Sequence, residues 1–168
     1  YKRNELEEKT GLGIFALSAI LVDKAEASEA LKANVVWSLG LDNPKYLLSS
    51  IQLNNFRLGK SINQEVDVKA EKGAYFLNSD IILEKESSKE WMIIANVNQN
   101  HSSIAKLSRQ IREELSLIDI VNDDINIGTK RLVELNSASD AIQITSDNLK
   151  DTRHFANTLF NIMRGGIF

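Results

Sequence analysis

The chain has 168 residues, of which 43% are hydrophobic and 26% charged, and its net charge is −3. These are values of a globular protein large enough to bury a core, and an acidic chain without a clustered basic stripe is not expected to bind nucleic acid. Because it has no cysteine and only two histidines, disulfides, thiolate catalysis and cysteine-based metal sites are excluded, and nothing is spaced for a nitrogen-rich zinc site.

The sequence also lacks the signatures of a cofactor site and of a membrane span. Its glycine clusters, at 11–13 and 165–166, do not match a phosphate-binding loop. We therefore predict no cofactor and no metal ligand. No run of 18 apolar residues occurs, so no transmembrane helix is expected. A cytoplasmic location is the default expectation, although a chain without cysteine fits export equally and a cropped N-terminus would hide a signal peptide.

The first hundred residues are expected to form part of an antiparallel β-sandwich. Residues 13–22 fit either a buried strand or a short helix, and residues 24–32 fit a helix or a loop. Residues 33–41 are rich in β-branched and aromatic side chains and end at a turn around Pro44. A further strand or strand pair is predicted over 46–56.

The clearest β signal lies between residues 66 and 97. Val66 and Val68 alternate with charged residues. Between residues 74 and 84, Tyr75, Leu77, Ile81 and Leu83 share one face of a strand, and the other face holds Asn78, Asp80 and Glu84 together with Phe76 and Ile82. A polar turn at 85–89 separates this stretch from the apolar run at 90–97. We predict that residues 74–84 and 90–97 form an antiparallel hairpin. No helical crossover separates the strands, which favours an antiparallel sandwich over a parallel α/β sheet.

From residue 101 to 168 the apolar period changes to that of a helix, and a linker of about three helices is predicted. The first carries a stripe from Ile104 to Ile118 at spacings of three and four. A loop rich in Asn and Asp is expected at 121–128, and a second helix at 129–142. Residues 145–148 are expected to cap a third helix that ends at Gly165. The fold class is therefore α+β, with a sandwich at 1–100 and helices at 101–168.

The third helix is two-sided, and its polar side is unusual. Apolar residues from Phe155 to Met163 fall on one arc, and the opposite arc holds His154, Asn157, Asn161 and Arg164. Asparagine is a mediocre helix former, so an asparagine-rich face suggests hydrogen bonding to a fixed partner. We consider these four residues candidates for an inter-domain contact, with an ordinary structural or solvated face as the alternative.

The other residues that could take part in catalysis or binding are better explained as parts of the surface or of the core. The carboxylate pairs at 7–8, 113–114 and 123–124 are adjacent in sequence, and neighbours on a helix do not face each other. His154 lacks an accompanying nucleophile motif. No catalytic residue is therefore assigned. Four aromatic residues could form a sugar-stacking platform but are more typical of a core: Trp37, Trp91, Tyr46 and Tyr75.

The most distinctive stretch of the chain is RHFANTLFNIMRGGIF at 153–168, preceded by DAIQ at 140–143. It resembles a segment of bacterial proteins related to cellobiose and chitobiose phosphorylases, a group that includes the phosphorylase part of cyclic β-1,2-glucan synthase. Three further stretches are similar to strands of that group's N-terminal domain, namely TGLGIFAL at 10–17, ANVVWSLGL at 33–41 and the stretch at 82–97.

This resemblance implies a larger architecture, in which a β-sandwich of the supersandwich type and a helical linker precede an (α/α)6 barrel. The family carries out inverting phosphorolysis of β-glucosidic bonds, in which an Asp of the barrel is the general acid and phosphate attacks. No barrel is found here, so no catalytic residue is carried over, and the segment is expected to be inactive alone. The implied partners are the barrel of the same parent chain and an oligosaccharide or glucan.

A second interpretation stays open, namely a free-standing module that binds carbohydrate or protein, with unknown carbohydrate-binding residues. A sandwich that lacks its earlier strands should have an open edge. We therefore also expect exposed apolar surface on the terminal helix or on one sheet face, with self-association into a homo-oligomer as its consequence.

Overall fold

The computed structural model describes residues 2–17, 32–139 and 142–165. The chain divides into two compact units, Tyr1–Glu114 and Leu115–Phe168, which we call the β unit and the helical unit. The β unit includes the first helix after the strands, so the division falls 14 residues later than the expected change at residue 101. The α+β fold class is confirmed.

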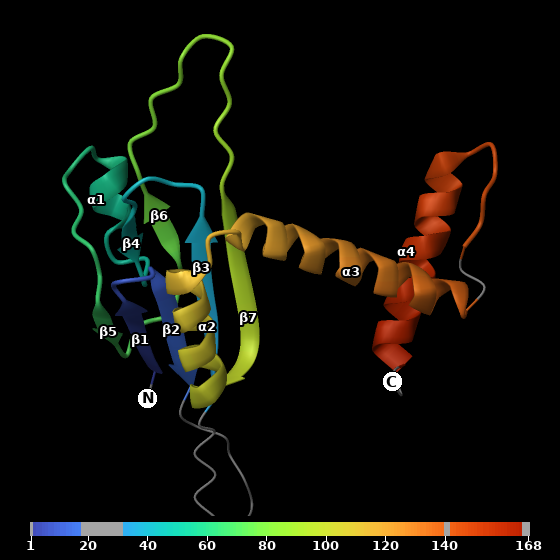
Figure 1. The fold of residues 1–168 in the computed structure, drawn as a ribbon, viewed down its shortest axis with the longest axis horizontal. Helices are drawn as coiled ribbons and strands as arrows, with labels where there is room; N and C mark the ends of the chain where they lie inside the picture. The colour runs from blue at the N-terminus through green and yellow to red at the C-terminus, as the bar shows by residue number, and fades with distance from the viewer. Residues whose placement is uncertain (1, 18–31, 140–141, 166–168) are drawn as a thin grey trace, which may run out of the picture. The chain divides into compact units, whose positions relative to one another are not determined.

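The β unit is built on a five-stranded antiparallel sheet within the described residues (Figure 1). Its strand order is β5-β1-β2-β3-β7. The strands are β1 (Lys2–Glu7), β2 (Leu12–Leu17), β3 (Lys32–Leu39), β5 (Asp67–Lys69) and β7 (Met92–Asn100). The expected strand at 33–41 is thus confirmed as β3. The expected element at 13–22 is a strand as far as Leu17, and the remainder, like the element at 24–31, lies outside the described residues.

A second sheet pairs β4 (Lys45–Leu47) with β6 (Phe76–Asn78). Here the prediction of a strand or strand pair over 46–56 is wrong beyond Leu47, because α1 (Leu53–Arg57) follows. The chain leaves the strand at Leu48, whose backbone N–H donates to Glu65 Oε2 at 2.7 Å instead of to a neighbouring strand. The strand was predicted from the apolar residues of this stretch, and these do not reveal a hydrogen bond to a residue 17 positions away.

The predicted hairpin between 74–84 and 90–97 is also wrong. β6 pairs with β4, whereas β7 pairs with β3 in the other sheet. The segment between β6 and β7 is a long loop in Figure 1. Alternation of side chains identifies a strand and its faces but not its partner. β7 finds a longer partner in β3, with pairs from Lys32–Asn100 to Leu39–Met92.

Both faces of the large sheet are covered. On one face Leu12, Val35 and Trp37 are buried, as the register between Ile14 and Val35 requires. On the other, Asn4 and Leu6 are buried, and the Asn4 side-chain amide donates to the Leu48 carbonyl at 3.2 Å beside β4. The small sheet therefore packs on this second face, which makes the unit sandwich-like.

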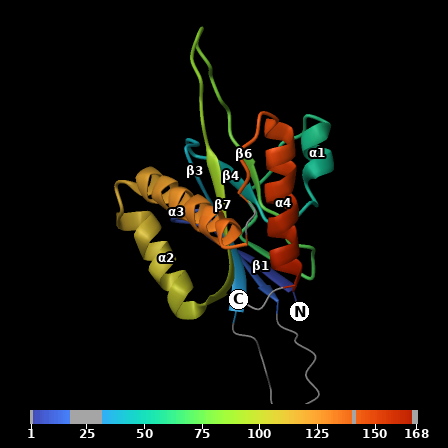
Figure 2. The ribbon, with the colours of Figure 1, turned by 90° about the vertical axis from the view of Figure 1, so that its right-hand side faces the viewer.

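Helix α2 (His101–Glu113) follows β7 directly, and Asn100 caps it by accepting from Ser103 N at 2.9 Å. It lies in front of β2 and β3 in Figure 1 and to one side of the sheet in Figure 2. Its apolar residues Ile104, Leu107 and Ile111 are half-buried. The predicted stripe is thus confirmed as far as Ile111, but this helix ends before Leu115 and Ile118.

The helical unit contains α3 (Leu117–Ser137) and α4 (Asn148–Gly165), which contact each other. The loop predicted at 121–128 is wrong, because α3 continues through it. The spacing of Ile118, Val121, Ile125 and Leu132 is helical throughout, so one stripe continues across the polar Asn and Asp residues. The second predicted helix, at 129–142, is therefore the end of α3, and α4 is confirmed as the third.

Candidate functional site

The β unit carries an open apolar groove of about 240 Å³. The groove is lined by residues of β6 and the residue before it, of the loop after β6 and of the start of β7, among them Tyr75, Phe76, Ile81, Trp91 and Ile93. Trp91, Ile93 and Ile81 are exposed. The lining includes one serine, Ser79, and its hydroxyl already donates a hydrogen bond to the Asp42 carbonyl at 3.0 Å. The groove therefore suits an apolar group better than a sugar, whose hydroxyls need hydrogen-bond partners.

The four aromatic residues considered for sugar stacking do not form one platform. Trp37 is buried in the core, whereas Trp91 is exposed. Tyr46 and Tyr75 pack against each other with ring centroids 5.9 Å apart. Burial raises the pKa of both phenols, so Tyr75 stays protonated and donates to the Gly11 carbonyl at 2.7 Å. Gly11 has a φ of +70°, in the left-handed region that glycine adopts without strain. The two tyrosines therefore pack against a turn whose backbone conformation requires glycine.

A carboxylate that sequence reasoning missed organises the loop after β4. Glu65 accepts from the Leu48 backbone, from Ser49 Oγ at 3.2 Å and from Gln52 Nε2 at 2.8 Å. Ser49 is fully buried. A serine that donates to a carboxylate, with no histidine as base among these contacts, is held in place and not activated as a nucleophile. Since these contacts span 13 to 17 residues, no local pattern could have revealed them.

The predicted polar arc lies on α4. Asn157, Asn161 and Arg164 are exposed, and His154 is half-buried. Their spacing along a continuous helix places all four on one side of it. The apolar side is also partly exposed, at Phe160 and Met163, which confirms the expected exposed apolar surface on this helix. The inter-domain contact itself stays a prediction.

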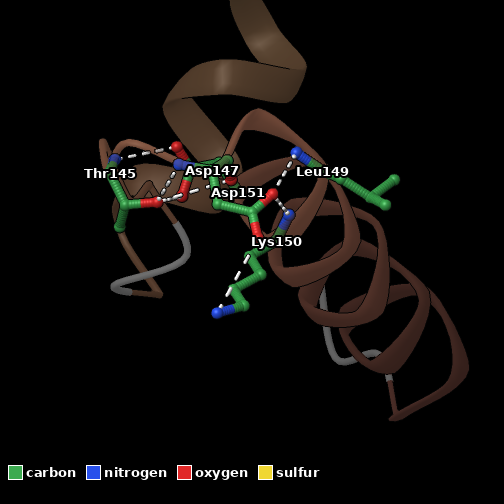
Figure 3. A network of polar contacts seen from close by, with 5 residues as sticks. All are labelled: Thr145, Asp147, Leu149, Lys150 and Asp151. Carbon is green, nitrogen blue, oxygen red and sulfur yellow. Dashed lines mark hydrogen bonds and ion pairs between the residues drawn. The ribbon is translucent and has the colours of Figure 1, made fainter.

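The start of α4 is fixed by a polar network (Figure 3). Asp147 Oδ1 accepts from the backbone N–H groups of Leu149 and Lys150 at 3.1 and 3.3 Å. Asp151 reaches back and accepts from both the backbone N–H and the hydroxyl of Thr145 at 2.8 Å. Asp147 is therefore the N-cap of α4, Asp151 ties the preceding loop to the first turn, and both carboxylates lie at the positive end of the helix dipole. The predicted cap at 145–148 is thus confirmed.

The described residues contain no group of three or more His, Cys, Asp or Glu side chains placed to hold a metal ion. None of the helices in the described ranges is long and apolar enough to cross a membrane. Of the carboxylate pairs, Glu113 and Glu114 are both exposed, as expected for a solvated helix surface. What the described part of the chain offers chemically is surface: an apolar groove on the β unit, and polar and apolar helix faces on the helical unit.

No protein-family model matches the chain, and a search of the curated proteins also finds no match.

Proposed function

We propose that this chain is a non-catalytic scaffolding segment of a carbohydrate-active protein that resembles the inverting disaccharide phosphorylases. In this proposal the β unit is the sandwich, the helical unit is the linker, and α4 contacts an adjacent helical barrel that carries the chemistry. The carbohydrate link rests on the resemblance of 153–168 and the upstream strands. The scaffolding role rests on the surface of the chain.

One observation supports the scaffolding role above the others. All the buried hydrophobic side chains of the described residues, from Leu6 to Ile62, belong to the β unit. The helical unit therefore presents two amphipathic helices without an apolar core of their own. Helices draw most of their stability from packing an apolar face, so such a pair is expected to pack on a further element. No constellation of nucleophile, base and orienting group accompanies it in the described residues.

The test compares this chain with a longer product of the same parent gene by hydrogen exchange. If α4 packs on a following domain, amides from Asn157 to Arg164 exchange at least about tenfold more slowly in the longer protein, because local opening then breaks that packing. The amides of β3, already in the sheet, serve as the control and change little. Equal exchange of α4 in both proteins, or a stop codon directly after Phe168, would contradict the proposal.

An activity measurement separates the scaffold from an enzyme. We expect the chain alone to release no sugar phosphate from β-linked glucosides with inorganic phosphate. Turnover by the isolated chain, lost on substitution of one of its own carboxylates, would contradict a non-catalytic role.

The alternative is a free-standing binding module, and the one observation that bears on it is the exposed Trp91 in the groove, although the apolar lining of that groove suits a sugar poorly. Isothermal calorimetry with β-glucosides, on the chain and on Trp91→Ala, distinguishes the two. Under the scaffolding proposal neither protein gives saturable heat. Saturable heat that Trp91→Ala removes would favour the module, since stacking on an aromatic face contributes strongly to sugar binding.

A further inference from the structure

Helix α3 carries a heptad pattern on one side. Apolar residues and one glycine recur at alternating spacings of three and four over its whole length: Ile118, Val121, Ile125, Gly128, Leu132 and Leu135. We call these six positions the α3 seam. Spacings of three and four that alternate without interruption place side chains in a narrow line, and such a line is how two helices pack side by side in a coiled coil.

Within the described residues, one half of the seam is exposed, whereas Val121, Gly128 and Leu135 are half-buried. Its three residues at the first heptad position are Ile118, Ile125 and Leu132, and they are 52%, 56% and 43% exposed. A surface helix of a closed domain would turn such residues inward. Contact with α4 does not bury them. An exposed apolar line of this kind marks an interaction surface.

Charged residues beside the seam indicate the orientation of the partner. Asp124 and Arg131 occupy the same flanking heptad position, seven residues apart, and both are exposed. In an antiparallel pair of identical helices this flank faces itself, so Asp124 of each copy meets Arg131 of the other. In a parallel pair the flank faces the opposite one, which holds the uncharged Asn122, Thr129 and Asn136. Charge complementarity therefore selects an antiparallel second copy.

The sizes of the seam residues fit the same arrangement. An antiparallel register that aligns Ile118 with Leu135 of a second copy also aligns Ile125 with Gly128. A Cβ added at Gly128 would meet no atom within 4 Å outside its own helix, so the missing side chain leaves room for that isoleucine. The large Ile125 then faces the small Gly128 in the two central layers of the interface, which allows the two helices to approach closely there.

From these observations we propose that α3 pairs antiparallel with α3 of a second copy of this chain. The contact uses α3 alone and leaves the polar arc of α4 unoccupied, so it is independent of the scaffolding proposal. A 21-residue helix is roughly 30 Å long and buries on the order of 500 Å² per copy in such a pair. This lies at the small end of specific interfaces, so we expect reversible dimers with a dissociation constant on the order of 10 μM.

Sedimentation equilibrium of the full chain over a wide concentration range tests the proposal. The matched pair of variants is Ile125→Asp, on the seam, and Ile127→Asp, which is 48% exposed on the opposite side of the same helix. We expect Ile125→Asp to weaken dimerisation at least about tenfold and Ile127→Asp to change it less than about threefold. A wild-type chain that stays monomeric at millimolar concentration, or equal losses in both variants, would overturn the proposal.

Charge reversal gives a second test that does not depend on how well Ile125→Asp folds. Asp124→Arg or Arg131→Asp alone should weaken the dimer, because each places like charges opposite each other in both symmetry-related pairs of that flank. Combining the two should restore the dissociation constant to within about threefold of the wild type. If the double variant is as weak as the singles, the flanking pairs do not exist and the antiparallel assignment fails.

The absence of cysteine makes the orientation directly measurable. In the proposed dimer Ile118→Cys should form a disulfide with Leu135→Cys when the two proteins are mixed, and should form little with itself. The two copies of position 118 then lie about 17 residues, or roughly 25 Å, apart along the axis. Efficient disulfide formation by Ile118→Cys alone would indicate a parallel pair and overturn the proposal.

Discussion

In the β unit Leu12, Val35 and Leu48 are fully buried, whereas the one buried side chain in the described part of the helical unit is Asn136. The strands of the β unit pair with partners far along the chain, and both faces of the sheet are covered from within the unit. The helical unit consists of two helices that follow each other and touch. The comparison teaches that a segment can form regular secondary structure without forming a closed apolar core. α3 and α4 are regular helices, but within the described residues they do not bury apolar side chains between them as the β unit does.

The largest expected difference between the two units is in the free energy of unfolding that is lost when one leucine in each unit is replaced by alanine. Leu48→Ala, in the core of the β unit, should reduce the free energy of unfolding by about 3 kcal/mol, because it leaves a cavity. Leu132→Ala, exposed on α3, should cost less than about 1 kcal/mol in dilute solution. Urea unfolding followed by circular dichroism measures both. Similar losses would mean that the helical unit has a core after all.

The next effect tests how the β unit is closed at its first turn. Gly11→Ala combines φ +70° with a collision between the new Cβ and the Tyr46 ring, and we expect a loss of about 2 kcal/mol or more. Gly59→Ala is the control, since Gly59 has φ +68° but open space around it, and should cost about 1 kcal/mol. Thermal unfolding of the two variants gives the comparison. Equal losses would show that the tyrosine does not restrict this turn.

A smaller effect, of opposite sign, is expected in the helical unit. Both side-chain amide atoms of Asn136 are buried without a hydrogen-bond partner, and such groups are costly. Asn136→Leu, which keeps the branching and removes the polar atoms, should stabilise the packing of α3 on α4 by roughly 1 kcal/mol. Hydrogen exchange of α3 amides measures the change. Asn122→Leu, at an exposed site on the same helix, should leave these rates unchanged, and destabilisation by Asn136→Leu would contradict this explanation.

The smallest expected effect is a pH dependence at the edge of the β unit. Arg3 donates to both carboxylate oxygens of Asp67, at 3.0 and 3.3 Å, and this lowers the pKa of Asp67. A carboxyl with a lower pKa in the folded state stabilises the fold above its unfolded pKa of about 4 and loses that contribution as the pH falls through its folded value. Because the pair is exposed, the change is small. When the free energy of unfolding is measured as a function of pH, Asp67→Asn should therefore lose slightly less stability than the wild type below about pH 4. An identical pH dependence in both proteins would show that the Arg3–Asp67 pair does not contribute to it.

Individual elements differ in how far the sequence could predict them. α4 was predicted closely because its apolar arc, its capping residues and its terminal glycine are all local signals. β3 was predicted for the same reason, by β-branched residues that end at a turn. The exposure of α4, with apolar Phe160 and Met163 at the surface, also followed from the pattern of a face that needs a partner.

The predictions that were wrong concern features that depend on which of several interactions is formed in the folded protein. Of the stretch predicted as a strand at 74–84, only Phe76–Asn78 is one, whereas the prediction at 90–97 corresponds to β7. β7 pairs with β3 and β6 with β4, and that selection depends on which edges meet in three dimensions. The loop expected at 121–128 is helical because the apolar stripe outweighs the low helix propensity of Asn and Asp. Glu65 was missed because a carboxylate that holds a distant loop looks like any surface glutamate.

The sequence by itself therefore determined the α+β class, the two-sided character of the terminal helix and the absence of cysteine chemistry, since these depend on residue type and on periods of two and about 3.6 residues. The tertiary structure decided the pairing of the strands, the continuity of α3 and the fact that the buried apolar side chains of the described residues belong to the β unit. These features depend on burial shared between residues far apart in the chain, and a local pattern states which side of an element is apolar without stating what covers it.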